Sequence, residues 1–162
     1  MLAGSLCFMG LAARKPIRGA LEVGWAVELN PGEIYGAALA RAYELESEVA
    51  GYPRIVLGTE LIKYLELHAN NTASDPFSQN DGALAAVCLS MVSEDFDGVA
   101  IINYLGESFR KYISDQSHPQ LYKMARQFVA GQLSVHHASG DSKLSDRYSR
   151  LSTYFASHSA AA

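Results

Sequence analysis

RGALEVGWAVELNPGEIYGAALARAYELESEVAGYPRIVL, residues 18–57, is the stretch that decides the fold class. Over residues 20–29, apolar residues alternate with small or acidic ones, which predicts a strand with one buried face. Gly24 in the middle of this strand indicates a close approach of another backbone or of a ligand. Asn30-Pro31-Gly32 is a turn signal. The residues expected on the buried face are Leu21, Val23, Trp25, Val27 and Leu29.

A helix is predicted over residues 34–49, because small and apolar residues recur there at three- and four-residue spacing. Gly51 is expected to end it as a C-cap residue, and a short strand is expected over 54–57. Thr59 is then expected to cap a further helix that runs to about Leu67. The buried stripe of the first helix is predicted to be Ala38, Ala42, Leu45 and Val49.

The remaining sequence predicts a mainly helical second part. Residues 1–67 are expected to form an α/β domain that opens with a core helix over 2–13. Residues 68–82 are polar and turn-rich, which predicts a loop, and residues 83–162 are expected to form a helical extension packed on the domain. The extension is expected to begin with an amphipathic helix that carries Leu84, Val87, Cys88, Met91 and Val92. A strand over 99–104 and short helices over 106–114 are expected next. A long helix over 119–137 and a last helix after Gly140 and Asp141 are expected to complete it. The inward residues are expected to be Leu121, Met124, Phe128 and Val135 on the long helix, and Leu144, Tyr148, Leu151 and Phe155 on the last.

Composition and charge exclude several classes of protein. The chain has 162 residues, 49% hydrophobic and 19% charged, which is ordinary for a globular domain. Residues 1–100 carry 6 Lys and Arg against 13 Asp and Glu (−7), and residues 101–162 carry 7 against 4 (+3). With a net charge of −4 and no cluster of basic residues, nucleic acid is not expected as a partner.

The sequence also bears on location. No basic segment precedes the apolar start of the chain, and no apolar run approaches the roughly 20 residues that a membrane span needs. Cys7 and Cys88 lie far apart in apolar patterns, so two buried free thiols in a reducing compartment are expected. We therefore expect a cytoplasmic protein that does not insert into membranes.

Known catalytic and metal-binding motifs are absent from the sequence. It contains no phosphate-binding glycine loop and no G-x-S-x-G nucleophile turn. Glu94, Asp95 and Asp97 do not match a calcium loop and are interpreted as an acidic turn before a strand. His136 and His137 are adjacent, and neighbours on a helix point about 100° apart, which does not suit one metal ion.

Three segments of the opening stretch resemble a known family. Residues 18–24, 36–46 and 53–57 correspond to a strand, a helix and a following strand in the second half of class III nucleotidyl cyclase domains, where a hairpin lies between the first strand and the helix. More narrowly, "AYELE" and "YPRI" resemble uncharacterised bacterial cyclase-like proteins. The resemblance covers about 17–66 and implies an α+β fold, with a small, partly incomplete sheet of the cyclase-like ferredoxin type followed by the helical extension.

The resemblance also implies where a nucleotide-binding remnant would lie. The family's ribose-orienting Asn falls at Ala40, its phosphate-stabilising Arg at Glu44 and its base-selecting Asp at Glu33, while Gly36 begins the helix motif. A carboxylate at Glu44 would repel a triphosphate, and loss of an electrostatic stabiliser typically costs several kcal/mol of barrier. The family's metal-binding carboxylates belong to its first half, which the chain is expected to lack. No cofactor is therefore expected, with Mg²⁺ or Mn²⁺ only if a missing half supplies ligands.

These observations predict a catalytically silent cyclase-like domain that acts as a binding, dimerisation or signalling module. The alternative is a divergent nucleotidyl cyclase that forms cyclic nucleotides from nucleoside triphosphates once a missing N-terminal half or a partner completes it. A third hypothesis is a small-molecule sensor that keeps only the nucleotide pocket. The chain is expected to be the C-terminal part of a longer parent. The partners implied are a second copy, the missing half or a nucleotide, and an unpaired edge on the 21–29 strand is expected to promote association.

Overall fold

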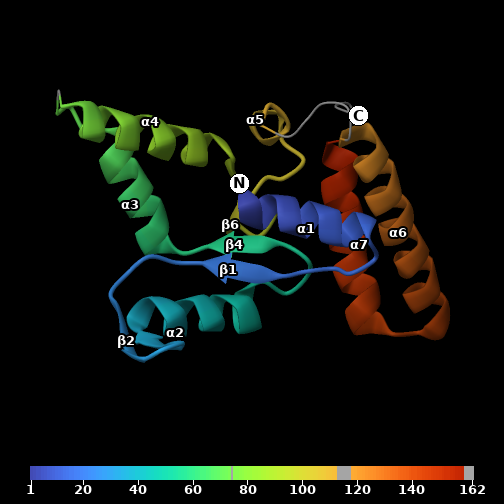
Figure 1. Cartoon of the computed structure of the whole chain (residues 1–162). Helices are drawn as coiled ribbons and strands as arrows, with labels where there is room; N and C mark the ends of the chain where they lie inside the picture. Colours follow the sequence, from blue (N-terminus) through green and yellow to red (C-terminus); the bar gives the residue numbers. More distant parts are fainter. Residues whose placement is uncertain (74, 113–117, 159–162) are drawn as a thin grey trace. The chain divides into compact units, whose positions relative to one another are not determined.

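The computed structural model describes residues 1–73, 75–112 and 118–158 (Figure 1). The fold is mixed α+β, with a four-stranded sheet, a separate two-stranded hairpin and a helical C-terminal region. The chain divides into two compact units that interleave along the sequence. The mixed unit comprises residues 19–50 and 55–102, and the helical unit comprises 1–18, 51–54 and residues from 103 onward.

The four-stranded sheet forms the centre of the mixed unit. Its strand order is β1 (Gly19–Leu21), β4 (Ile55–Leu57), β6 (Ala100–Ile102) and β5 (Val92–Glu94). β1 runs parallel to β4, whereas β4–β6 and β5–β6 are antiparallel. The two inner strands carry fully buried β-branched residues, Val56 and Ile101, which is typical of strands covered on both faces.

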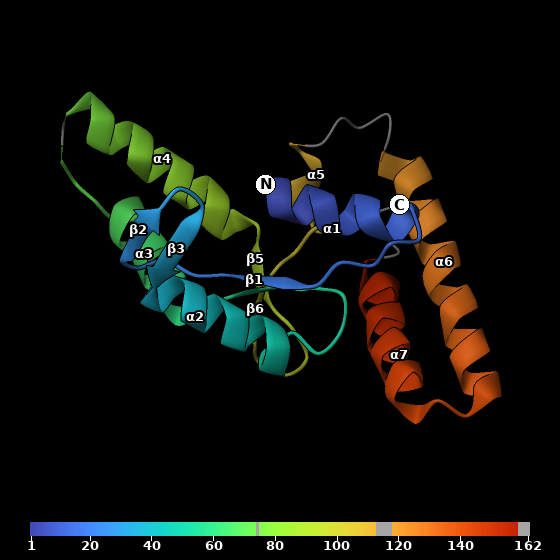
Figure 2. The same ribbon diagram turned by 60° about the horizontal axis from the view of Figure 1, so that its bottom comes forward.

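A hairpin and a helix follow β1. The strands β2 (Ala26–Asn30) and β3 (Glu33–Gly36) pair with each other, and α2 (Ala37–Glu44) continues into the π-helical turn η1 (Leu45–Val49) (Figure 2). Beyond β4 the chain forms α3 (Thr59–Ala69) and α4 (Pro76–Ser90), which pack against each other.

The start of α3 has a cap that is remote in sequence. Glu22, just after β1, accepts a hydrogen bond from the backbone N–H of Leu61 at 2.8 Å and another from Val23 at 2.8 Å. Gly58 precedes the helix, and a Cβ at that position would overlap the Glu22 carboxylate. The carboxylate therefore satisfies a free donor of the first helical turn, which is the work of an N-cap side chain.

The helical unit consists of α1 (Leu2–Ala12), α5 (Glu107–Arg110), α6 (His118–Ser139) and α7 (Ser142–Ser157). α6 packs against both α1 and α7 (Figure 1). The core of the helical unit is aromatic. The centroid of the Phe8 ring lies 5.2 Å from that of the His118 ring and 6.0 Å from that of the Tyr104 ring. The Tyr122 hydroxyl donates to the Phe155 carbonyl at 2.9 Å, so this buried phenol is satisfied.

Most predicted elements are confirmed. The core helix over 2–13 is α1, the Asn30-Pro31-Gly32 turn closes the hairpin with Gly32 at φ 84°, and Gly51 ends the preceding helix at φ 61°. The strand over 54–57 is β4, and the acidic turn joins β5 to β6. The expected inward residues of α2 and η1 are half-buried, while Arg41, Glu44 and Glu48 are exposed. Gly24 also lies as expected, since a Cβ there would contact the Ala38 methyl at 3.3 Å.

The predicted strand over 20–29 is wrong in extent and in burial. It is two strands, β1 and β2, and residues 22–25 lie between them. Residues of the face that was expected to be buried are exposed to solvent: Trp25 is 92% exposed and Leu29 is 67% exposed. The alternation is real, but β2 pairs with β3 in a hairpin and does not continue the sheet. For the same reason the helix predicted from residue 34 starts at Ala37, because residues 33–36 form β3.

Other corrections concern segment ends and helix faces. The predicted loop 68–82 is mostly helical, because Asp75 caps α4 by accepting from the Ser78 N–H at 3.0 Å and Pro76 occupies the first turn. α4 buries Ala85, while Leu84 and Cys88 are exposed and Met91 and Val92 lie beyond its end. α6 turns inward Tyr122, Ala125 and Val129, a stripe offset from the predicted one. Gly58 occupies the cap position expected for Thr59.

The short helices predicted over 106–114 reduce to α5, and residues 113 and 114 lie outside the described residues. The domain limits at 1–67, 68–82 and 83–162 stay a prediction. Among the described residues, none of the helices has the length and apolar character of a membrane span.

Candidate functional site

The four residues of the expected nucleotide-binding remnant all lie in the hairpin and α2. Glu33 opens β3 and accepts a hydrogen bond from the Asn30 side-chain amide at 2.6 Å. Ala40 and Glu44 lie one turn apart on α2 and are exposed. Gly36 joins the two elements, and a Cβ there would overlap the Trp25 carbonyl oxygen. Gly36 therefore has a structural role, because it lets the two hairpin strands approach where α2 begins.

An exposed apolar surface dominates the same segment. Val27 and Tyr35 are paired across the hairpin and project from one face of it, whereas Ile34 is paired with Glu28 and projects from the other face. Leu39 and Tyr43 are four residues apart and share one face of α2. We call the following seven side chains, each more than half exposed, the hairpin–helix surface: Trp25, Val27, Leu29, Ile34, Tyr35, Leu39 and Tyr43.

The surroundings of this surface are acidic. Residues 19–50 contain six glutamates and one arginine, which gives a net charge of −5. Arg41 is that arginine, and it lies on α2 between Leu39 and Tyr43. The six glutamates are Glu22, Glu28, Glu33, Glu44, Glu46 and Glu48.

The hairpin has little support of its own. In the described part of the chain, β2 and β3 pair only with each other. All of β2 is exposed, and only Gly36 of β3 is partly covered. An isolated two-stranded hairpin is marginally stable in water, and its outer edges keep unpaired backbone donors and acceptors. Both features are typical of a segment that binds another surface.

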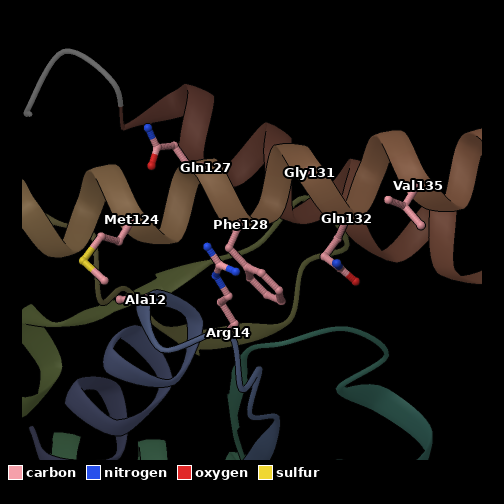
Figure 3. Close-up of a pocket in the computed structure, with 8 residues that line it drawn as sticks. All are labelled: Ala12, Arg14, Met124, Gln127, Phe128, Gly131, Gln132 and Val135. Atoms are coloured by element: carbon pink, nitrogen blue, oxygen red, sulfur yellow. The ribbon is translucent and has the colours of Figure 1, made fainter.

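The cavities considered next are lined by described residues and lie elsewhere. One of about 720 Å³ adjoins α3 and is lined by residues that include Lys63 and His68. One of about 430 Å³ in the helical unit is lined by residues that include Arg147 and Tyr148. A third, of about 360 Å³, lies between the end of α1 and α6 (Figure 3). None of the three is lined by a residue of the expected remnant.

The polar groups considered in the sequence have local roles. In the acidic turn, Asp95 accepts from the Phe96 N–H at 2.8 Å and Asp97 from the Val99 N–H at 3.3 Å. His136 stacks on Tyr148, with ring centroids 5.5 Å apart. Within residues 1–73, 75–112 and 118–158, no group of three or more His, Cys, Asp or Glu side chains is placed to hold a metal ion.

The two thiols differ, contrary to the expectation that both are buried. Cys7 is fully buried and Cys88 is exposed. Burial raises the pKa of the Cys7 thiol to about 12, an effect that a hydrogen bond with Tyr104 partly offsets. Cys7 is thus an inert core residue.

Comparisons with protein-family models, with curated proteins and with solved structures found no match to this chain.

The exposed surface is what sequence reasoning missed. The alternation over 20–29 indicated one apolar face correctly, but a strand pattern does not state what covers that face. A signal was present: Ile34 and Tyr35 lie one residue beyond the Asn30-Pro31-Gly32 turn and Leu29 lies just before it, so apolar residues flank the turn on both sides, which is typical of a hairpin.

Proposed function

We propose that this protein is a non-catalytic binding module and that its hairpin–helix surface docks a basic protein partner. The observation that carries the proposal is Trp25, a tryptophan 92% exposed in the same hairpin–helix segment as six other exposed apolar side chains. Large apolar side chains gathered on a surface mark interaction sites, and Trp and Tyr are enriched among the residues that contribute most to binding.

The size of the surface supports this function. Trp25, Tyr35 and Tyr43 are 92%, 55% and 71% exposed, so together they offer roughly 300–550 Å² of contact area. Val27, Leu29 and Leu39 add to that area, while Ile34 lies on the opposite face of the hairpin. A standard interface buries about 800 Å² on each partner, so the surface has the right order of size for a specific complex.

The charge of the segment favours one kind of partner. A second copy docked face to face would bring two regions of charge −5 together, which opposes association. A partner with an apolar centre and Lys or Arg at its rim would instead complement the glutamates. The unpaired edges of β2 and β3 also suit an extended segment that adds a strand.

The absence of catalysis is part of the proposal. Support comes from the resemblance, in which Ala40 and Glu44 replace the amide and the guanidinium that the family uses on its nucleotide. Residues 19–69 form a strand, a hairpin, a helix, a strand and a helix, which is the order that the resemblance implies. Under this proposal the chain keeps the order of elements that the resemblance implies and lacks the two groups that act on the nucleotide.

The test uses the single tryptophan as its reporter. Fluorescence of the protein is followed while a synthetic peptide of alternating Lys and Val is added, with a Glu and Val peptide as the comparison. We expect a saturable blue shift with the basic peptide only, weaker at high salt because the charges are screened. Tyr35→Ser and Tyr43→Ser should weaken binding, whereas Phe77→Ser, at an exposed aromatic on α4, should not.

Two results would overturn the docking part of the proposal. A blue shift that depends on protein concentration without peptide would show that a second copy covers the surface, and an unchanged emission under all conditions would remove the docking role. Incubation with ATP, GTP, CTP or UTP and Mn²⁺ tests the catalytic part, because any cyclic nucleotide formed would show an active cyclase.

A further inference from the structure

Arg14 has a backbone conformation that its side chain disfavours. α1 ends at Ala12 and its C-cap residue is Ala13, after which Arg14 takes φ 62°. The Lys15 N–H donates to the Gly10 carbonyl at 2.7 Å and the Arg14 N–H to the Leu11 carbonyl at 3.1 Å, which is a Schellman motif. Glycine is preferred at this position, because a Cβ is disfavoured in the left-handed region.

Gly131 is the opposite case, a glycine at a position where a residue with a side chain is preferred. It lies inside α6, where glycine is less favourable than alanine. A Cβ at Gly131 would meet nothing within 4 Å, so no neighbouring element requires the missing side chain. Local stability would favour glycine at position 14 and a larger residue at position 131.

Both positions line the same cavity, the 360 Å³ space between the end of α1 and α6. Figure 3 shows Arg14 reaching from the end of α1 toward Phe128, with Met124 pointing toward Ala12. Local rules tend to be broken where function requires it. Here Arg14 brings a charged group to the cavity and Gly131 keeps it open.

The lining indicates the chemistry of the ligand. Arg14 is its one charged residue, and in the described part of the chain the Arg14 guanidinium forms no ion pair. One guanidinium matches one carboxylate with two parallel hydrogen bonds. Gln127 and Gln132 add amide donors, and Met124, Phe128 and Val135 provide apolar contact.

We propose that this cavity binds a small amphipathic monocarboxylate, with the carboxylate on Arg14 and the apolar chain along Met124 and Phe128. A volume of 360 Å³ lies at the lower end of the roughly 300–1,000 Å³ range of small-molecule pockets, which suits a small ligand. Decanoate has this size and this chemistry. The site lies in the helical unit and does not depend on the binding function proposed for the hairpin–helix surface.

The experiment is a titration with decanoate, followed by NMR of the methionine methyl groups. The Met124 signal should shift saturably, while that of Met91, buried in the mixed unit, stays unchanged. Decanol and decylamine, which lack the carboxylate, should bind far more weakly. Arg14→Gln should lower the affinity for decanoate by about tenfold to a hundredfold, the usual effect of losing a hydrogen bond to a charged group.

Stability and binding should change in opposite directions. Arg14→Gly and Gly131→Ala are each expected to raise the melting temperature by about 2–4 °C and to weaken decanoate binding. The controls are on exposed parts of α6: Arg126→Gln should leave both properties unchanged, and Ser134→Ala should leave binding unchanged. Any of three results would overturn the proposal. The first is equal shifts of the Met124 and Met91 signals, and the second is unchanged decanoate binding by Arg14→Gln. The third is a lower melting temperature in both Arg14→Gly and Gly131→Ala.

Discussion

The helical unit and the mixed unit differ in where they place most of their aromatic side chains. The helical unit buries Phe8, Tyr104, Phe109 and Phe155 almost completely. The mixed unit buries small β-branched residues on its inner strands but leaves Trp25, Tyr43 and Phe77 exposed. Burial of apolar surface is the main favourable term in folding, so the buried aromatic residues stabilise the helical unit. The mixed unit keeps its exposed aromatic residues available for contact, which is the basis of the proposed binding function.

The two cysteines provide the test with the largest expected effect. Cys88 in the mixed unit is exposed and Cys7 in the helical unit is fully buried. We expect dithiobisnitrobenzoate to label Cys88 in the native protein, and to label Cys7 slower by roughly 10³-fold or more, because Cys7 must wait for unfolding. Mass spectrometry of the labelled peptides gives both rates. Rapid labelling of Cys7 would show that the helical unit opens easily and would remove the contrast.

A pair of aromatic substitutions compares the units directly. Phe8→Ala removes a ring that packs against Tyr104 and His118, and should lower the free energy of unfolding by about 3–5 kcal/mol. Trp25→Ala removes an exposed side chain and should change it by no more than about 0.5 kcal/mol. Urea unfolding followed by circular dichroism measures both. A loss above about 2 kcal/mol for Trp25→Ala would mean that Trp25 packs in the fold.

Alkaline pH should destabilise the helical unit through Cys7. The unfolded thiol has its usual pKa near 9.0, whereas the pKa of the buried thiol is about 12. Between these values the unfolded state binds fewer protons, so stability should fall by about 1.4 kcal/mol per pH unit from this group. The contribution is fully present below pH 9 and is lost as the pH rises to 12.

Unfolding of Cys7→Ala at several pH values isolates this effect, because the variant lacks the thiol but keeps the other titrating groups. Its stability should decline less steeply above pH 9 than that of the parent. Cys88→Ala serves as the control and should follow the parent. Equal slopes for Cys7→Ala and the parent would contradict the burial of Cys7.

The last comparison concerns two helix caps, one in each unit. Glu22→Ala removes the acceptor for the Leu61 N–H, and Asp141→Ala removes the acceptor for the Leu144 N–H at the start of α7. Each should cost about 1 kcal/mol, the usual value of an N-cap interaction. If the two units unfold in separate steps, each variant should shift only the step of its own unit in hydrogen exchange. A Glu22→Ala variant as stable as the parent would show that the remote cap is not needed.

The sequence by itself determined the positions and types of most elements. Spacings of three and four residues located α2 and α7, apolar residues at the start located α1, and β-branched residues located β4. Asn30-Pro31-Gly32 and Gly51 marked the turn and the helix end correctly. These signals depend on residues close together in the sequence, within about one turn, so they can be recognised without knowing the fold. The candidate residues Glu33, Gly36, Ala40 and Glu44 came from a resemblance. Their place in one hairpin–helix segment came from the structure.

Only the tertiary structure decided what each face meets. β2 pairs with β3 and not with the sheet, so an alternation typical of a half-buried strand became an exposed surface. Glu22 caps a helix 39 residues away, and Arg14 and Gly131 line one cavity although 117 residues separate them (131 − 14). Contacts of this kind depend on how distant segments pack, and local periodicity carries no information about that choice.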